Sequence, residues 1–223
     1  MITLRRIRRE HVLAAVFFFL VAALVVGQRF GFRWAGGEGY QTPREARVLQ
    51  LQGSGTVDRD GTKRPLTVGG AVARGETVAT NAGGYALLAF DGERIALDER
   101  TTATVDENDA GGVRVDLMQG RVLVDTRRTS DGPPITVKTG NATSSVARGA
   151  LSVVFYDFLW QADVWPLRAT MTVASPADGS LASSTALRVS TDGAAKATPS
   201  AADFDHGPSA AFYRWTQSFD PFR

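Results

Sequence analysis

Cysteine is absent from this sequence of 223 residues, and histidine occurs only twice, at His11 and His206. Without thiols the chain cannot form a disulfide framework, a thiolate zinc site, an iron–sulfur cluster or a cysteine nucleophile. Two histidines also provide little material for a histidine-rich metal site. These absences exclude several classes of metal-dependent and thiol-dependent enzyme. They leave the cellular compartment open, because an exported protein need not contain a disulfide.

An excess of one charge is also missing, since 25 Lys and Arg residues face 23 Asp and Glu residues and the formal net charge is +2. The basic residues are concentrated at the N-terminus, where four arginines occur within the first ten residues. Further along the chain, acidic and basic residues are interspersed. Nucleic-acid binding requires basic residues gathered on one folded surface, so we expect no nucleic-acid partner.

One long hydrophobic run stands out, at residues 12–27, with the sequence VLAAVFFFLVAALVVG. In a bilayer such a run must be helical, because no water is present to satisfy its backbone groups. As a helix it reaches about 24 Å, and its aromatic and basic flanks extend it towards the hydrocarbon thickness of about 30 Å. We interpret residues 12–30 as an uncleaved transmembrane signal anchor. A cleaved signal peptide is the alternative, although its small-x-small cleavage site would be poor.

The arginines that precede this run predict its orientation. Positively charged flanks stay in the cytoplasm, so residues 1–11 form a cytoplasmic basic tail and the remainder of the chain is exported. We therefore expect a single-pass protein of the bacterial inner membrane with a periplasmic C-terminal domain. Residues 31–43, which contain the glycine-rich stretch GGEG, form the expected linker between anchor and domain.

Short apolar stretches separated by glycine or Asp-Gly turns dominate the sequence from residue 44 onward. The segment VRVDL at residues 113–117 gives the clearest strand pattern, because its apolar and charged residues alternate. The pair Asp91-Gly92 is typical of a β-hairpin turn. Strands that recur about every eight to twelve residues predict an all-β antiparallel domain, with a sandwich or jelly-roll-like architecture, over residues 44–175.

Residues 176–223 are rich in Ala, Ser, Thr, Pro and Asp. This composition predicts a loose C-terminal extension with one strand, at residues 186–190. Near its end, Phe212, Trp215 and Phe219 are three and four residues apart, which places them on one face of a short helix. We expect this helix to dock on the β domain; contact with a partner or a membrane is the alternative.

A series of short motifs runs in order through residues 47–155. The motifs are GETVAT at 75–80, ALLAFDG at 86–92, IAL at 95–97, VDLMQGRVLV at 115–124 and PITVKT at 134–139. In this order they resemble the exported domain of the FecR family of membrane-anchored regulators. Gly149-Ala150 departs from the Gly-Thr pair of the family, and Ser152 stands where an aromatic residue is usual.

The resemblance implies an exported β domain that binds protein. Anti-sigma members of the family carry a helical domain in the cytoplasm, for which the short tail of residues 1–11 has no room, so we expect no anti-sigma domain. The C-terminal module with which the family meets an outer-membrane receptor is also not evident. The resemblance therefore does not extend to iron-uptake signalling.

Motifs that carry known chemistry are incomplete. Residues 106–117 begin like a calcium-binding loop, but Ala110 and Leu117 occupy two of its ligand positions, which favours a solvated hairpin loop. The sequence NAT at residues 141–143 is a formal glycosylation sequon that we interpret as a chance match. The sequence GSG at residues 53–55 lacks the third glycine of a dinucleotide-binding motif and precedes no helix.

Acid–base and nucleophilic sites are equally unsupported by the sequence. His206 lies in a tail that would not hold a base against a nucleophile, and His11 is expected at the membrane edge. No spacing singles out two carboxylates for glycoside hydrolysis. We therefore predict no catalytic, metal-binding or cofactor-binding residues, no cofactor and no enzymatic activity.

Arginines recur on the expected solvent face of the strands: Arg94, Arg114, Arg121, Arg127 and Arg128. They could form a stripe that binds an acidic polymer such as a polysaccharide. Acidic residues nearby favour a balanced, solvated face instead: Asp91, Asp116 and Asp125.

The sequence thus predicts a membrane-anchored periplasmic binding or scaffold module in envelope signalling. Its expected partners are the inner membrane and another envelope protein. An exposed sheet edge, which accepts a further strand, is the expected binding mode. The alternative is a component of envelope assembly or surface-polysaccharide production that binds a polymer or a lipid.

Overall fold

The computed structural model of the chain describes residues 45–90, 92–126, 132–167, 170–176, 179–196 and 210–218. The chain divides into two compact units, Met1–Thr42 and Pro43–Arg223, and the described residues belong to the second. The predicted tail (1–11), anchor (12–30) and linker (31–43) lie outside the described residues. Within the described ranges, no helix combines the length and apolar character that a membrane span requires.

Strands make up most of the described residues, in agreement with the predicted all-β antiparallel class. In chain order they are β1 (Ala46–Gln52), β2 (Gly55–Arg59), β3 (Thr62–Pro65), β4 (Ala71–Val72), β5 (Thr77–Thr80), β6 (Tyr85–Phe90), β7 (Glu93–Leu97), β8 (Thr102–Glu107), β9 (Val113–Thr126), β10 (Ile135–Lys138), β11 (Thr143–Val146), β12 (Gly149–Tyr156), β13 (Gln161–Pro166), β14 (Met171–Ser175), β15 (Gly179–Ser183), β16 (Leu187–Ser190) and β17 (Gly193–Lys196). A 3-10 helix, η1 (Asp157–Leu159), joins β12 to β13, and the helix α3 (Ala210–Gln217) lies near the C-terminus.

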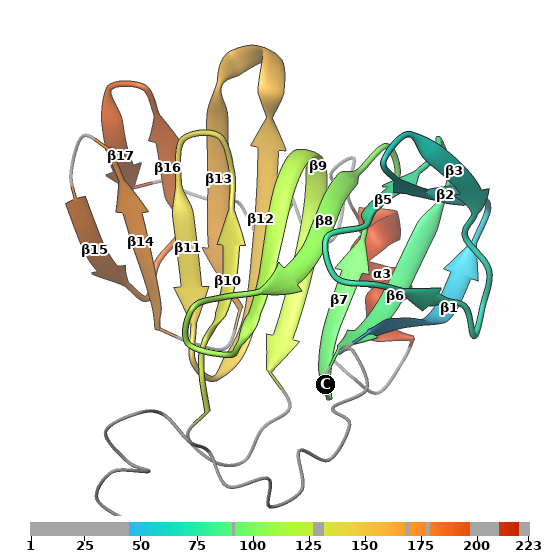
Figure 1. The fold of residues 1–223 in the computed structure, drawn as a ribbon. Helices are drawn as coiled ribbons and strands as arrows, with labels where there is room; N and C mark the ends of the chain where they lie inside the picture. The colour runs from blue at the N-terminus through green and yellow to red at the C-terminus, as the bar shows by residue number, and fades with distance from the viewer. Residues whose placement is uncertain are drawn as a thin grey trace, which may run out of the picture. The chain divides into compact units, whose positions relative to one another are not determined.

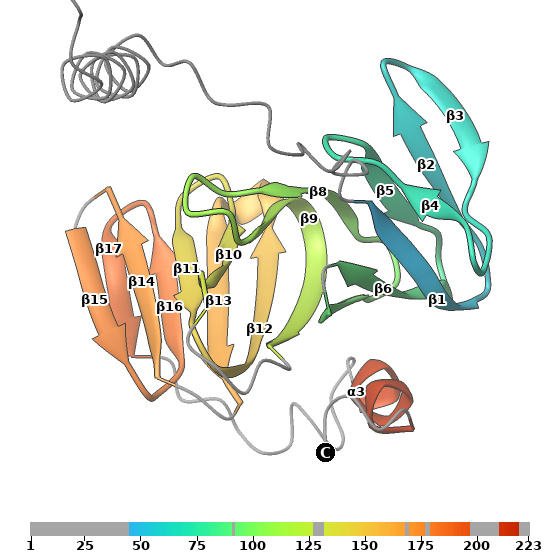
Figure 2. The same cartoon turned by 60° about the horizontal axis from the view of Figure 1, so that its bottom comes forward.

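Strand pairing creates two sheets that share the long strand β9. Sheet A has the order β4-β1-β6-β7-β9-β12-β13-β16-β17. Sheet B has the order β3-β2-β5-β8-β9-β10-β11-β14-β15. The pairing of β9 with β10 is parallel, and the other described pairings are antiparallel. Figures 1 and 2 show the hairpins of sheet B beside those of sheet A.

The crossing of β9 between the sheets depends on a glycine. Residues 113–119 pair in sheet B and residues 120–126 pair in sheet A. Gly120, at the crossing, has a φ of 90°, a backbone conformation that side chains other than glycine rarely adopt. A Cβ there would lie 2.7 Å from the Cα of Thr101. Thr101 Oγ1 accepts a hydrogen bond from the Arg121 N–H (3.0 Å), which fixes the chain just after the crossing.

The hydrophobic core lies between the two sheets. In β9, Val113, Val115 and Leu117 are buried while Arg114 and Asp116 face outward, as the alternation in the sequence predicts. Many other strands contribute fully buried side chains: Leu88, Phe90, Ile95, Leu97, Ile135, Leu151, Met171 and Leu187. Burial of these side chains supplies the main driving force for folding, at roughly 1.5–3 kcal/mol for each large apolar residue.

From β6 onward, successive hairpins are added alternately to the two sheets. The pair β6–β7 lies in sheet A, β8 and the first half of β9 in sheet B, and the second half of β9 in sheet A. The hairpin β10–β11 then lies in sheet B, β12–β13 in sheet A, β14–β15 in sheet B and β16–β17 in sheet A. Both sheets therefore grow in sequence order towards the edge strands β15 and β17 (Figure 1).

The predicted domain boundary at residue 175 is wrong, because it falls inside the hairpin β14–β15. The predicted loose extension from residue 176 instead supplies β15, β16 and β17 to the sheets. The strand expected at residues 186–190 is confirmed as β16. Residues 197–209 lie outside the described residues.

The C-terminal helix α3 packs on the outer face of sheet A, where the sequence predicted a docked helix. Phe212 and Tyr213 of α3 are buried against three apolar residues that point away from the core: Leu87, Ala96 and Leu123. The Trp215 ring lies tilted against the Tyr85 ring, with 5.4 Å between ring centroids. The helix explains why β6, with the sequence YALLAF, is apolar on both faces. Phe219, the third predicted aromatic, lies outside the described residues.

Candidate binding surface

The candidate calcium loop is a structural hairpin connection between β8 and β9. Asn108 organises this loop, because its Oδ1 accepts hydrogen bonds from the N–H groups of Ala110 (3.1 Å) and Gly112 (2.8 Å). Its Nδ2 donates to the carbonyl oxygen of Pro134 (2.9 Å). Across the described ranges, no group of three or more metal-ligating side chains converges. The loop therefore serves to close the hairpin.

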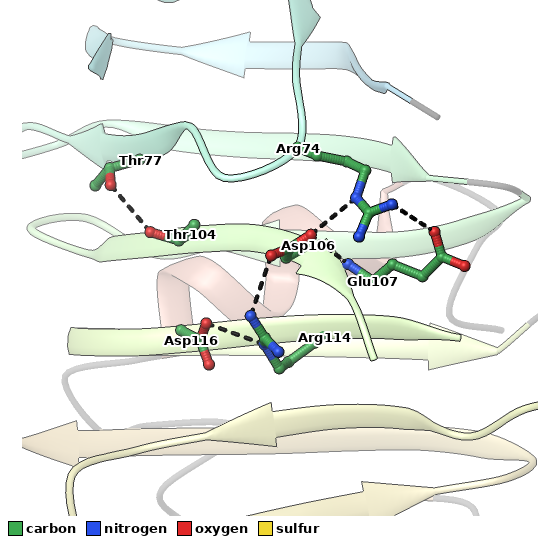
Figure 3. A network of polar contacts seen from close by, with 7 residues as sticks. All are labelled: Arg74, Thr77, Thr104, Asp106, Glu107, Arg114 and Asp116. Carbon is green, nitrogen blue, oxygen red and sulfur yellow. Dashed lines mark hydrogen bonds and ion pairs between the residues drawn. The ribbon is translucent and has the colours of Figure 1, made fainter. Parts of the chain in front are cut away.

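The acidic residues that flank this loop belong to an ion-pair network on the outer face of sheet B (Figure 3). Arg74 bridges Asp106 (2.9 Å) and Glu107 (2.9 Å). Arg114 bridges Asp106 (3.1 Å) and Asp116 (3.1 Å). Burial on its own would raise the pKa of Asp106, but hydrogen bonds from the Glu107 N–H and Arg74, together with the charges of both arginines, lower that pKa below its usual range. An aspartate held ionised in this way cannot act as a proton donor near neutral pH.

The five arginines that could have formed a stripe do not share one face. Arg114 lies on the outer face of sheet B, where it pairs with Asp116. Asp125, another acid expected on the solvated face, is buried. Arg94 and Arg121 lie on the outer face of sheet A by strand alternation. Arg121 contacts the Tyr213 ring of α3, with 5.4 Å from the guanidinium carbon to the ring centroid. Arg127 and Arg128, like Asp91, His11 and His206, lie outside the described residues.

The remaining sequence candidates have structural roles. Asn141, the sequon asparagine, is buried, and its Nδ2 donates to the carbonyl oxygens of Trp160 (2.8 Å) and Val189 (2.9 Å). Gly53 lies in the turn between β1 and β2 with a φ of 67°, and a strand follows it, not a helix.

Two deeply buried carboxylates are also committed to arginines. Asp163 pairs with Arg188 through both carboxylate oxygens, each 2.7 Å from a guanidinium nitrogen. Glu76 pairs with Arg64 (2.7 Å) and Arg59 (3.2 Å) and accepts the N–H of Ala73 (2.8 Å). Pairs of this kind fix the register of neighbouring strands and offer no free acid or base.

The two edge strands of sheet B differ sharply in character. Edge strand β3, with the sequence TKRP, carries Lys63, Arg64 and Pro65, which are residue types that discourage strand addition. Edge strand β15, with the sequence GSLAS, has neither charge nor proline, and four of its five residues are exposed. Within the described ranges β15 pairs with β14 alone. The β15 edge is therefore the one suited to accept a partner strand.

A second exposed feature is the turn between β12 and β13, which we call the aromatic tip (Tyr156–Trp160). Phe158 is 80%, Leu159 57% and Trp160 48% exposed. The sequence did not predict this turn, because the segment YDFLW contains no glycine or proline and resembles the continuation of an apolar strand.

The central strands of the domain match a known protein family. Residues 76–156 match the family model described as FecR protein. The FecR-family segment thus includes β5 to β12 and the crossing strand β9, and the expected resemblance is confirmed for it. The segment ends at Tyr156, the first residue of the aromatic tip.

Two crystal structures of one protein from Parabacteroides distasonis ATCC 8503, described as "a putative anti-sigma factor", are similar to this chain. Each has 20% sequence identity and a TM-score of 0.49, and the match covers 57% of this chain and 61% of that chain. No curated protein matches the sequence. The family assignment therefore rests on residues 76–156.

Proposed function

We propose that this protein is a non-enzymatic binding or scaffold module in envelope signalling. Residues 12–30 anchor it in the bacterial inner membrane, and the β domain lies in the periplasm. The FecR-family segment supports a regulatory role, because the resemblance implies regulators that act through protein contacts. The acids Asp106, Glu76 and Asp163 are each paired with arginine, an arrangement that supports structural roles for them.

The open edge of β15 is the observation that supports protein binding. A strand at a sheet edge presents unpaired backbone groups, and a partner strand can satisfy them. Leu181 of β15 is exposed and lies opposite Val173 of β14, so its side chain points towards the layer between the sheets. A partner strand added beyond β15 would cover this apolar residue as well as the backbone.

Photocrosslinking in the native envelope tests this proposal. A photoreactive residue at Ala182, which is exposed on β15, should give a discrete adduct with another envelope protein. The change Leu181→Lys should abolish the adduct, because a charge at the edge opposes strand addition. The same photoreactive residue at Lys63, on the protected edge β3, is the matched control and should give none. Equal labelling at both edges, or no protein adduct at Ala182, would refute strand addition.

Two further results bear on the location and on the alternative function. A reporter that is active only in the periplasm, fused after residue 40, should be active, and an inactive fusion would place the N-terminus outside. Adducts that contain only glycan or lipid would favour the alternative of a component that binds polymer or lipid in envelope assembly. Arg114 itself is paired with two acids and is therefore not available to an acidic polymer.

A further inference from the structure

We infer that the aromatic tip is an anchor that inserts into an apolar pocket of a partner protein, with a basic group of the partner facing Asp157. This inference rests on the proposed function and assigns it a second contact, separate from the β15 edge. The partner is identified by this chemistry, an apolar pocket with a basic rim.

The exposure of the tip has no structural explanation within the described domain. No residue of η1 is buried. Phe158 contacts the Tyr156 ring, with 6.5 Å between centroids, yet remains 80% exposed. Scattered apolar residues are common on protein surfaces, but three consecutive large ones form a patch of the kind that marks interaction sites. Aromatic residues at such positions carry much of the binding energy in protein interfaces.

The backbone of the tip is held in an uncommon conformation. Trp160 has φ 51° and ψ 44°, the left-handed region, which costs a residue other than glycine about 1–2 kcal/mol. Its N–H donates to the Asp157 carbonyl oxygen (3.1 Å), and its own carbonyl oxygen accepts from the buried Asn141 (2.8 Å). Uncommon backbone conformations persist only where the surroundings enforce them.

The indole ring of Trp160 is fixed as well. It meets the Phe155 ring edge-on, with 5.7 Å between centroids. It also lies directly over Gly140, where a Cβ would come within 2.6 Å of the ring. The tip thus presents Phe158 and Leu159 from a rigid base. Such preorganisation lowers the entropy that a binding residue loses when it enters a pocket.

Charges around the tip favour a protein pocket over a bilayer. Asp157 lies within the tip and is exposed, and Asp192 is exposed in the adjacent β16–β17 turn. Insertion of an aspartate into a membrane costs about 2.5–3.5 kcal/mol at the bilayer centre, and anionic headgroups would repel both carboxylates. Contact between the tips of two copies would bring the two Asp157 carboxylates together. A basic rim on a different protein would instead be attracted.

The tip also lies far from the point where the described domain begins. Near its start, strand β1 pairs with Ala89 of β6. Successive pairings across sheet A place Ala89 in line with Ala150 of β12. The tip follows Tyr156, six residues further along β12, which corresponds to about 20 Å. In Figure 1 the hairpin β12–β13 extends beyond the ends of the neighbouring hairpins. The tip therefore projects from the end of the strands opposite to the one where β1 pairs with Ala89.

Photocrosslinking of the full chain in cells, followed by binding measurements with purified proteins, tests the inference. A photoreactive residue at Phe158 should give one discrete protein adduct. The same residue at Val68, which is 62% exposed in the β3–β4 turn, should give none. The partner, once identified and purified, should bind the full chain at least tenfold more weakly after Phe158→Ala and after Asp157→Lys, and unchanged after Val68→Ala. Phe158 and Val68 are both exposed, so neither alanine variant should alter folding.

Other outcomes overturn the inference. A phospholipid adduct, or Phe158-dependent binding to vesicles of phosphatidylethanolamine and phosphatidylglycerol (3:1), would assign the tip to a bilayer. An adduct of twice the chain mass would assign it to a second copy. An affinity that Phe158→Ala leaves unchanged would remove its role as an anchor. Adducts at Ala182 without adducts at Phe158 would overturn only the inference about the aromatic tip. Adducts at neither position would overturn the proposed function as well.

Discussion

The carboxylate of Asp98, beside helix α3, predicts a specific pH dependence of stability. Asp98 follows β7, and its side chain is only 14% exposed. Burial raises its pKa from 3.8 to about 6, although a hydrogen bond from the Glu99 N–H and the charge of Arg121 act in the opposite direction and the Glu99 charge adds to the rise. Arg121 is close enough to attract this carboxylate, with 3.6 Å between Nη1 and Oδ2.

The substitution Asp98→Asn removes this titration. A group whose pKa is higher in the folded state stabilises the fold below its unfolded pKa, and that contribution is lost as the pH rises through its folded pKa. A pKa of 3.8 in the unfolded chain and about 6 in the folded protein corresponds to at most about 3 kcal/mol lost between pH 4 and pH 7. The asparagine variant does not lose it. Relative to the wild type, its free energy of unfolding should therefore rise by up to that amount over this interval and stay level above pH 7.

Urea unfolding of the two proteins at pH 4, 5, 6 and 7 measures this difference. Loss of the pair with Arg121 lowers the stability of the variant by a further amount. The rise with pH of the variant's free energy of unfolding, relative to the wild type, is added to that loss. Asp192→Asn is the control, because Asp192 lies in the exposed β16–β17 turn. This variant measures the effect on stability of removing an aspartate that is not buried. A difference between Asp98→Asn and the wild type that stays constant from pH 4 to pH 7 would refute the reasoning.

Three other substitutions test the packing of the tip and of α3. Asn141→Leu should lower the free energy of unfolding by about 1–3 kcal/mol, because the carbonyl oxygens of Trp160 and Val189 lose their donor; urea unfolding measures the loss, and an unchanged midpoint would contradict it. Gly140→Ala should cost about 1–3 kcal/mol by displacing the Trp160 ring. The cost should shrink in a Trp160→Ala background, so an additive double-mutant cycle would argue against the contact. Phe212→Ala should cost about 3–5 kcal/mol and increase the binding of an apolar dye, since α3 would no longer cover sheet A; unchanged dye binding would mean that α3 is held by other contacts.

The strands were predictable wherever the apolar residues alternate. Val113, Val115 and Leu117 reveal their buried face in the sequence alone, because side chains alternate along a strand. The division of β9 between two sheets was not predictable, since it depends on the contact of Gly120 with Thr101, which lies in an earlier turn. Residues 179–196 were misjudged because their small polar side chains resemble a linker. They form strands because β13 and β14 provide edges on which hairpins can continue.

The candidate surfaces were predictable to different degrees. The sequence predicted binding at a sheet edge and a balanced arginine face. The pair of Arg114 with Asp116 agrees with the second prediction, whereas the burial of Asp125 does not. The aromatic tip escaped prediction, because Trp160 adopts a left-handed backbone conformation that sequence rules assign to glycine. The roles of Asn141 and Gly140 depend on the position of that tryptophan, so neither role is visible in a local motif.

The alternating addition of hairpins has a consequence for how the chain matures. Each hairpin after β6 pairs with strands that precede it in the chain, so a polypeptide that emerges N-terminus first always meets an edge already built. Strands such as β13 and β16, or β11 and β14, are separated by only a few tens of residues, and contacts of short sequence separation form quickly. The nascent domain can thus assemble vectorially, and at every stage its exposed edge is the template for the next hairpin. The last such template among the described residues is β15, which has no successor there in sheet B, so the edge that serves assembly during synthesis is also the edge offered to a partner strand.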